Sequence, residues 1–414
     1  MATLALISLG LLLLVALEQC VAVLVFMRYC RQRSVPATDG VLPNVLVVLP
    51  VRGADDTLAD CIGGLARQDY ANYRVRIVLD SDVDPGRQVV DDVLADLPDL
   101  PIEVVELVEP HARCSLKCSA VYQVTENLGD CEVVALLDTD VVPHANWLRE
   151  LIAPLADEQV GATTGNRWYL PQQGQWGSLV RYCWNAAAVA TMYFWGMPWG
   201  GTLAIKRKVL DGTDLRERWL RAGCEDVPLV AVLKKLRLQV HFVPSLLMVD
   251  RNECAMRACL RFLDRQLLWT RLYYPACWWI CNIWQVAIAL SMVVLLFCAL
   301  AGLATGQWLL LAYGALGIGI CVTTSLLMVR WMEHDLLPQG KGPAMRWPLK
   351  TWCAVALTSL LIVRVIWISL WTREIKWRGI DYKISGPWDV QLVEYRPYSA
   401  APPAAEAEQS GALV

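Results

Sequence analysis

The sequence reads Cys-Glu-Val-Val-Ala-Leu-Leu-Asp-Thr-Asp from Cys131 to Asp140. Its five consecutive apolar residues, Val133–Leu137, predict a strand buried on both faces, as the strands of parallel sheets are. The strand runs directly into Asp138. In open α/β sheets, ligands bind beyond the carboxyl ends of the strands. This stretch therefore predicts the centre of a parallel sheet and a polar site at its edge.

Strand and helix patterns alternate on both sides of this stretch, from residue 44 to residue 250. We expect further strands at Val45–Leu49, Val75–Leu79, Glu103–Leu107 and Val240–Val243. We expect helices at Thr57–Arg67, Arg87–Asp96, Ser115–Leu128 and Trp147–Ala156. Such alternation predicts the α/β class with a mostly parallel, doubly wound sheet, and 44–250 is long enough for one domain.

The composition and the apolar ends of the chain indicate a membrane protein. Hydrophobic residues make up 56% of the 414 residues, and Trp, which favours membrane interfaces, occurs 19 times. Residues 1–33 are interpreted as an uncleaved transmembrane anchor. Arg28, Arg31 and Arg33 follow its apolar run, so the chain after them is expected in the cytoplasm.

Residues 280–385 are expected to form a C-terminal transmembrane region. Apolar spans occur at about Trp278–Leu303, Trp308–Val329 and Trp352–Trp371. Basic residues on both sides of the third span predict a re-entrant, interfacial or tilted segment. Residues 251–279 read as an amphipathic helix in the interface plane, with an ordinary packing helix as the alternative. Residues 399–414 are rich in Ala, Pro and Glu and are expected to be disordered.

Charge and cysteine content exclude several other classes of protein. The net charge of −3 gives no basic face for nucleic acid. The 15 Cys are odd in number and scattered, and the 4 His do not cluster. Buried, reduced thiols in a cytosol-facing protein therefore fit better than disulfides or a structural zinc site.

Two predicted strand ends carry carboxylates. Asp80 follows the strand at Val75–Leu79, where an Asp can accept hydrogen bonds from a base or a ribose. Asp138 and Asp140 are spaced to hold a hard divalent cation, Mg²⁺ or Mn²⁺, which would complete its shell with phosphate oxygens. The alternative for both sites is a turn with solvated carboxylates.

A third acidic motif follows a glycine pair. Gly200 and Gly201 allow the backbone to approach a ligand closely. Glu225 and Asp226 then precede a predicted helix that runs from Leu229 to Leu236. Asp226 is suited to deprotonate an acceptor hydroxyl as a general base. Its alternative role is to cap that helix.

The order and spacing of these motifs carry a family resemblance. The set comprises Pro50-Val51-Arg52-Gly53, Asp80-Ser81-Asp82, Asp138-Thr139-Asp140, Gly200-Gly201-Thr202, Glu225-Asp226, the segment 265–271 and the C-terminal stretch 375–383. Together they resemble the large inverting glycosyltransferase family with the GT-A fold, and within it the ceramide glucosyltransferases. The resemblance implies a Rossmann-like, mostly parallel catalytic domain between membrane helices.

The resemblance also implies roles for individual residues. Asp80 would contact the nucleoside of a UDP-sugar donor, and Lys117 would approach that donor. Asp138 and Asp140 would hold the Mn²⁺- or Mg²⁺-bound diphosphate and the sugar, and Asp226 would be the base. On the acceptor side, where a lipid such as ceramide would bind, we expect Gly200, Gly201 and Glu225.

The motif at residues 265–271 departs from the family pattern. Trp269 matches a conserved Trp, but the Arg expected before it is Leu268. That Arg would ordinarily stabilise the departing diphosphate. Arg265 and Arg271 lie about one helical turn away and are candidate substitutes on the donor side.

Four functions compete on the sequence alone. The first is transfer of one sugar, glucose by resemblance, to a membrane lipid. The second is a processive polysaccharide synthase, which needs a secretion channel and usually more spans. The third is a catalytically inactive, nucleotide-binding membrane scaffold, which Leu268 favours and Asp138, Asp140 and Asp226 oppose. A transporter fits poorly with so large a polar domain.

Overall fold

The computed structural model describes residues 1–32, 42–97, 100–337 and 346–398. The predicted disordered tail, 399–414, lies outside them. The chain divides into two compact units. We call the first the helical unit; it comprises Met1–Gln32, Tyr169–Thr191 and Arg251–Thr372. We call the second the α/β unit; it comprises Arg33–Trp168, Met192–Asp250 and Arg373–Val414.

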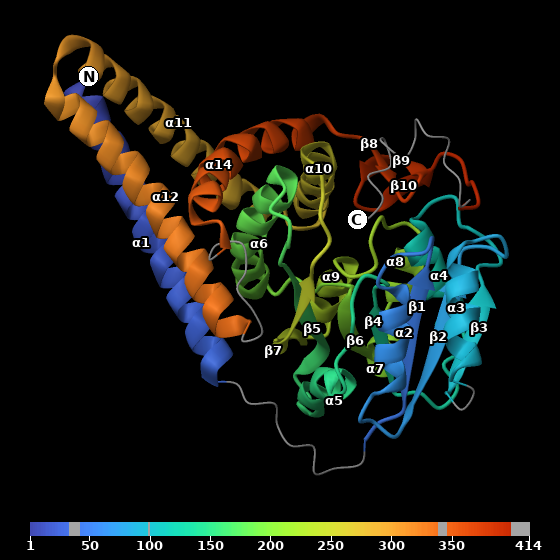
Figure 1. Ribbon diagram of the computed structural model, residues 1–414. Helices are drawn as coiled ribbons and strands as arrows, with labels where there is room; N and C mark the ends of the chain where they lie inside the picture. The colour runs from blue at the N-terminus through green and yellow to red at the C-terminus, as the bar shows by residue number, and fades with distance from the viewer. Residues whose placement is uncertain (33–41, 98–99, 338–345, 399–414) are drawn as a thin grey trace. The chain divides into compact units, whose positions relative to one another are not determined.

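A seven-stranded sheet forms the centre of the α/β unit (Figure 1). Its strand order is β3-β2-β1-β4-β6-β5-β7. The strands are β1 (Val45–Val51), β2 (Tyr73–Leu79), β3 (Ile102–Glu106), β4 (Val133–Leu137), β5 (Val160–Tyr169), β6 (Thr202–Lys206) and β7 (Gln239–Asp250). All five predicted strands are present, and β4 has the predicted bounds.

The sheet is mixed and mostly parallel, as predicted. Strand β1 is parallel to β2 and β4, and β2 is parallel to β3. Strand β6 is antiparallel to both β4 and β5. Strands β5 and β6 were not predicted from the sequence. Strand β6 follows directly on the glycine pair at 200–201, which was interpreted only as a ligand-binding loop.

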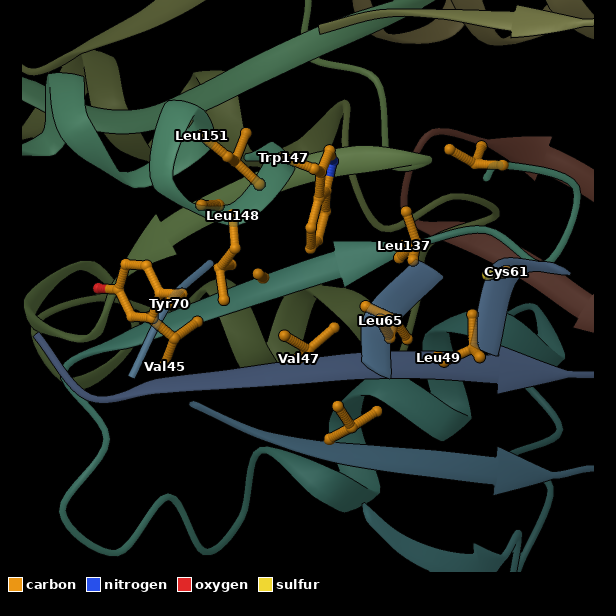
Figure 2. Close-up of a cluster of buried hydrophobic side chains, with 14 of the residues drawn as sticks. Val45, Val47, Leu49, Cys61, Leu65, Tyr70, Leu137, Trp147, Leu148 and Leu151 are labelled. Atoms are coloured by element: carbon orange, nitrogen blue, oxygen red, sulfur yellow. The ribbon is translucent and has the colours of Figure 1, made fainter. Parts of the chain in front are cut away.

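The sheet core is packed on both faces. Val45, Val47 and Leu49 of β1 are fully buried and point toward α2 and α5 (Figure 2). The alternate residues Leu46 and Val48 are also fully buried, because successive strand side chains point to opposite faces. Helix α4 contacts β1 and β2. A strand buried on both sides explains why β1 and β4 lack polar alternation.

Short helices connect the strands of this unit. They are α2 (Leu58–Ala66), α3 (Gly86–Ala95), α4 (Leu116–Val124), α5 (Trp147–Ile152) with the 3₁₀ turn η1 (Ala153–Ala156), α7 (Arg207–Asp211), α8 (Leu215–Trp219) and α9 (Pro228–Lys235). The four helices predicted for this region are all found, with ends that differ by at most four residues. The Ser115 hydroxyl caps α4 by accepting a hydrogen bond from the amide of Cys118 at 3.1 Å.

A small second sheet completes the α/β unit. It has the order β10-β9-β8 and consists of β8 (Glu374–Trp377), β9 (Ile380–Gly386) and β10 (Asp389–Leu392). Residues 280–385 were expected to form the membrane region. Strand β8 and nearly all of β9 come from that range, but with β10 they form an antiparallel meander in the α/β unit. Strands β8 and β9 alternate exposed and less exposed residues, the pattern of a sheet that is packed on one face.

The helical unit consists of long apolar helices. They are α1 (Ala2–Gln32), α10 (Met256–Tyr273), α11 (Pro275–Thr305), α12 (Trp308–Leu336) and α14 (Pro348–Trp371), together with α6 (Trp176–Trp195) up to Thr191. Among the described residues, α1, α11, α12 and α14 are long and apolar enough to cross a membrane. These four helices indicate an integral membrane protein.

Two expected segments of this unit have different bounds in the structure. The helix expected over residues 251–279 is α10, which ends at Tyr273 before Pro275 begins α11. Proline is favoured at the first position of a helix, because its missing N–H would have no partner there. The third apolar span is a continuous helix, α14, that packs against α10 and α11. Its course in a bilayer stays a prediction.

The core makes a simple stability prediction. Replacing the fully buried Leu49 with Ala leaves a cavity, so Leu49→Ala should lower the free energy of unfolding by about 2–5 kcal/mol. Leu236→Ala is the matched control, because Leu236 is 39% exposed, and it should change stability by about 0.5 kcal/mol or less. Chemical denaturation of the full chain in detergent measures both. Equal losses in the two variants would contradict the packing described.

Candidate active site

Lys117 joins carboxylates from two distant stretches of the chain. Its ammonium group lies 2.5 Å from Asp138 Oδ1, at the end of β4, and 2.6 Å from Glu225 Oε1. Lys117 is in the first turn of α4, where the helix dipole disfavours a positive charge. The two carboxylates offset that cost. The site is therefore assembled around a cation held between motifs that are 87 residues apart in the sequence.

A second cation, Arg167 of β5, contacts three carboxylates. Its Nη2 lies 2.8 Å from Asp140 Oδ1 and 3.3 Å from Asp138 Oδ2, and its Nη1 lies 3.6 Å from Asp250 Oδ2. The guanidinium also stands 4.9 Å from the ring centroid of Trp199, within the range of a cation–π contact. Both Asp138 and Asp140 are thus paired with Arg167 in this structure.

Asp226 faces the glycine pair rather than the helix that follows it. Its Oδ2 accepts a hydrogen bond from the amide of Gly200 at 2.9 Å, and its Oδ1 accepts one from Val227 at 2.7 Å. The N-cap of α9 is Val227, and no side chain caps it. The capping role considered for Asp226 is therefore wrong, because its carboxylate is turned into the cluster.

The two glycines make room for the carboxylate cluster. A Cβ on Gly200 would lie 1.7 Å from Glu225 Oε1, and one on Gly201 would lie 2.8 Å from Asp138 Oδ2 and 2.1 Å from the ring of Trp199. Real Cβ atoms essentially never approach other atoms that closely. The close approach expected at these glycines is thus found, but to the chain's own carboxylates. Their predicted acceptor contacts stay a prediction.

Asp80 lies at the end of β2 under a segment from the C-terminal part of the unit. Arg52 donates to Asp80 Oδ2, and the Tyr395 hydroxyl donates to the Asp80 carbonyl at 3.0 Å. The amide of Tyr398 lies 3.4 Å from Asp80 Oδ2. The other carboxylate oxygen, Oδ1, is buried and accepts no hydrogen bond from the described residues.

Burial and neighbouring charges separate the pKa values of these acids. Burial raises the pKa of Asp140 to about 6, Arg167 opposes this, and the carboxylates of Asp138 and Asp250 add to it. Burial would also raise the pKa of Asp138, but Lys117 and Arg167 outweigh it and lower that pKa. Strongly perturbed acids that lie close together are typical of functional sites.

The acids near the glycine pair are also perturbed. Burial raises the pKa of Glu225 to about 7 against the effect of Lys117, and the carboxylate of Asp226 adds to the rise. Burial raises the pKa of Asp226 above its ordinary value, whereas Lys117 and two backbone amides oppose the rise. A carboxylate with a raised pKa is a stronger base than an exposed one.

The structure therefore brings most of the predicted site residues into one cluster of the α/β unit. These are Lys117, Asp138, Asp140, Gly200, Gly201, Glu225 and Asp226, connected by the contacts above. Asp80 lies in the same unit. The other three, Arg265, Trp269 and Arg271, belong to α10 of the helical unit, and their donor-binding roles stay predictions.

Helix α10 has its own internal contacts. Leu268 is fully buried, and Trp269 and Arg265 are nearly so. Arg271 donates from Nη1 to the Leu370 carbonyl at 2.6 Å and from Nη2 to the Thr372 carbonyl at 3.4 Å, at the end of α14. Positive charge is favoured at a helix C-terminus, so Arg271 stabilises α14.

Sequence reasoning missed three residues of the cluster. Arg167 lies on strand β5, which was not predicted. All residues of that strand are buried in the structure. Asp55 accepts hydrogen bonds from Arg378 at 2.8 and 2.9 Å and from the Thr139 hydroxyl. Arg378 was noted only as part of a C-terminal motif, and the sequence gives no sign that it meets Asp55, 323 residues away.

The donor set at the end of β4 fits a hard divalent cation. In the described part of the chain, no group of three or more His, Cys, Asp or Glu is arranged to hold a metal ion. Mg²⁺ commonly takes only one or two protein carboxylates and completes its shell with water and substrate phosphates. The oxygens of Asp138 and Asp140 provide such a pair, and the like charges around Asp140 favour a nearby cation.

The fold and the site define the class of protein. A mixed, mostly parallel sheet in the order 3-2-1-4-6-5-7 carries carboxylates at the ends of β2 and β4. This is the GT-A arrangement of glycosyltransferases that the motif order implied. More particularly, residues 9–387 match Glycosyl transferase family 21. The chain belongs to that family.

Relatives of established name match only parts of the chain. A ceramide glucosyltransferase from Gibberella zeae is 33% identical over 87 residues, which are 20% of this chain and 16% of that enzyme. An N-acetylglucosaminyltransferase from Bradyrhizobium elkanii is 26% identical over 142 residues, 32% of this chain and 71% of that protein. The chain thus aligns with about a sixth of the length of the fungal enzyme.

A solved structure is similar over more of the chain. It is a mannosyltransferase from Pyrobaculum calidifontis in complex with GDP-Man and Mn²⁺. The similarity covers 88% of this chain and 99% of that one, with 18% sequence identity and a TM-score of 0.49.

The glycine pair yields a prediction about the site. Gly200→Ala forces its new methyl group against Glu225, so it should displace that carboxylate from Lys117 and cost about 1–3 kcal/mol of stability. Gly386→Ala is the control in the same unit, because a Cβ there meets nothing within 4 Å. Thermal unfolding of the detergent-purified chain measures both variants. An unchanged melting temperature for Gly200→Ala would show that the two glycines are not needed for space.

Proposed function

We propose that the chain transfers one sugar, with inversion, from a nucleotide-sugar donor to a membrane lipid at the cytoplasmic face. The donor proposed is UDP-glucose and the acceptor a lipid such as ceramide. The observation that supports this most strongly is the convergence of Asp138, Asp140 and Glu225 on Lys117 and Arg167, with Asp226 next to Glu225 and bonded to the amide of Gly200. The same chain carries four helices of membrane-spanning length.

Asp80 is proposed to bind the donor's nucleoside. Its Oδ1 is a buried acceptor without a hydrogen bond from the described residues, and leaving such an atom unsatisfied costs free energy. A base N–H or a ribose hydroxyl would satisfy it. Arg52, Tyr395 and Tyr398 surround the other side of this carboxylate. They would form the wall against which the nucleoside binds.

The diphosphate is proposed to lie near Asp138 and Asp140. These carboxylates would hold Mn²⁺ or Mg²⁺, which supplies positive charge to the leaving group when bound. In this structure, Lys117 and Arg167 form ion pairs with the same carboxylates. Both are long, cationic side chains within reach of that region, and they would turn toward the phosphate oxygens when the donor binds.

Asp226 is proposed as the general base of a single displacement. It would accept the proton of the acceptor hydroxyl while that oxygen forms a bond to the anomeric carbon. The bond from the anomeric carbon to the phosphate oxygen breaks, and its electron pair stays with the diphosphate. The amides of Gly200 and Val227 fix the carboxylate, and its raised pKa makes it a stronger base. Glu225, Gly200 and Gly201 would border the acceptor.

A lipid acceptor is supported by the apolar helices and by the partial likeness to a ceramide glucosyltransferase. The cytoplasmic orientation rests on Arg28 and Arg31 at the end of α1. Entry of the lipid along α10, which carries Arg and Trp side chains among apolar ones, is part of the same proposal. A processive synthase would differ in adding many sugars to one product.

The test is a transfer assay. The detergent-purified chain is incubated with Mn²⁺ or Mg²⁺, a panel of UDP-sugars and extracted membrane lipids, and products are identified by mass spectrometry. We expect a lipid that is heavier by one hexose. Asp226→Asn should reduce transfer by at least about 100-fold, because the amide cannot accept the proton, with donor binding largely kept. Full activity in Asp226→Asn would show that the base is misassigned, and a ladder of products would favour the processive synthase.

The same base predicts a pH dependence. Asp226 must be ionised to act, and its pKa lies above the ordinary value of 3.8. Activity should therefore fall as the pH decreases through that raised pKa, with a midpoint above 3.8. The measurement is kcat/KM for the acceptor between pH 4 and 8, at saturating donor and metal. A rate that stays constant down to pH 4 would contradict the role.

A further inference from the structure

In the family pattern, an Arg at the position of Leu268 would stabilise the departing diphosphate. This inference rests on the proposed function. Leu268 occupies the position of the expected Arg and is fully buried. Of the two nearby substitutes, Arg271 donates to two carbonyls at the end of α14. The residues around Asp138 and Asp140 are therefore further candidates to provide a cation for the leaving group.

Arg378 enters that region from the small C-terminal sheet. It lies in the two-residue turn between β8 and β9, where Trp377 pairs with Ile380. Its Nη1 and Nη2 lie 2.8 and 2.9 Å from the two carboxylate oxygens of Asp55. Asp55 in turn accepts a hydrogen bond from the hydroxyl of Thr139. Thr139 is the residue between Asp138 and Asp140, so one carboxylate separates Arg378 from the proposed metal-binding loop.

The bonds to Asp55 use only one edge of the guanidinium. A guanidinium has five N–H donors. Those on the end of the fork meet Asp55, and Nη1 also lies 3.2 Å from the Arg52 carbonyl. The Nε–H and the second Nη2–H, which form the other edge, have no hydrogen-bond partner among the described residues. The side chain is 23% exposed, and a guanidinium edge of this kind matches the spacing of two phosphate oxygens.

The backbone at Arg378 is held in an unfavourable conformation. Its φ is +49°, and that of Gly379 is +79°. A two-residue hairpin turn with both φ positive strongly favours Asn or Asp followed by Gly, because other side chains are strained there. An Arg in this position does not stabilise the turn itself. Strain of this kind tends to be kept where the side chain has a function.

Two further contacts fix the turn against the cluster. The Arg52 Nε donates to the Arg378 carbonyl at 2.8 Å, which makes the contact between the two arginines reciprocal. The Tyr382 hydroxyl of β9 lies 3.3 Å from the amide of Leu116, at the start of the helix that carries Lys117. The small sheet is thus attached both to the first strand's end and to the Lys117 helix.

We infer that Arg378 is a residue of the donor site, whose free guanidinium edge binds the diphosphate of the nucleotide-sugar and stabilises it as it departs. It takes over the charge that Leu268 cannot supply. Burial would lower the pKa of this guanidinium, but the carboxylates of Asp55, Asp140 and Asp138 outweigh burial and raise that pKa. The small sheet then contributes a residue to the donor site.

The test compares the binding of two nucleotides to the purified full chain. Arg378→Asn suits the turn, because Asn tolerates positive φ, and it removes the guanidinium. Titration calorimetry with UDP and with UMP, in the presence of Mg²⁺, should show UDP affinity reduced roughly 10- to 100-fold in the variant, as expected for lost charge-assisted hydrogen bonds. UMP affinity should change less than about threefold. Equal loss for both nucleotides, or no loss, overturns the inference.

Matched variants separate binding from a structural role. Lys376→Gln removes one exposed positive charge from the same hairpin and should leave UDP affinity unchanged. Arg378→Lys keeps the charge without the fork and should lose part of the UDP affinity only. If Asp55→Asn reproduces the full UDP-selective loss, Arg378 acts only through Asp55, and the inference is overturned. If the unaltered chain binds no UDP, the proposed function fails together with the inference.

Discussion

The structure depends on the neutralisation of carboxylates that are crowded at one edge of a buried sheet. Parallel strands end at the same edge, so polar residues that follow β2 and β4 meet there. Taking such groups out of water is costly unless they are paired. Lys117 and Arg167 provide the pairing, and each contacts more than one carboxylate. The cluster is stable only when strands β4 and β5, helix α4 and the 225–226 turn are all in place.

The same arrangement suits the anionic donor of the proposed function. Under that proposal, a divalent cation on Asp138 and Asp140 would leave Lys117 and Arg167 available to phosphate. Removing one partner from a buried pair is more costly than the pair is stabilising. We therefore expect this edge of the sheet to be less stable than its core, as binding sites commonly are. Burial raises the pKa values of Glu225 and Asp226, and the neighbouring carboxylates add to the rise.

Local patterns accounted for much of the fold. Uninterrupted apolar runs identified β1 and β4, because strands covered on both faces need no polar residues. Strand β5 was not predicted, because its buried residues include the polar residues Thr163, Asn166 and Arg167. Those side chains find partners only in the folded unit. Strand β8 and nearly all of β9 were assigned to the membrane region because they directly follow an apolar span.

The sequence by itself determined the order of the sheet-forming segments, the apolar helices and the acidic motifs. Each of these features depends only on the types and spacing of residues that are close together in the chain. Only the tertiary structure decided which groups share a site. Asp226 turned toward Gly200 rather than toward its own helix, and the glycines were needed for their small size beside carboxylates. Arg378 met Asp55 across 323 positions. Such contacts depend on where separate segments end in space, and no local pattern of residue types records that.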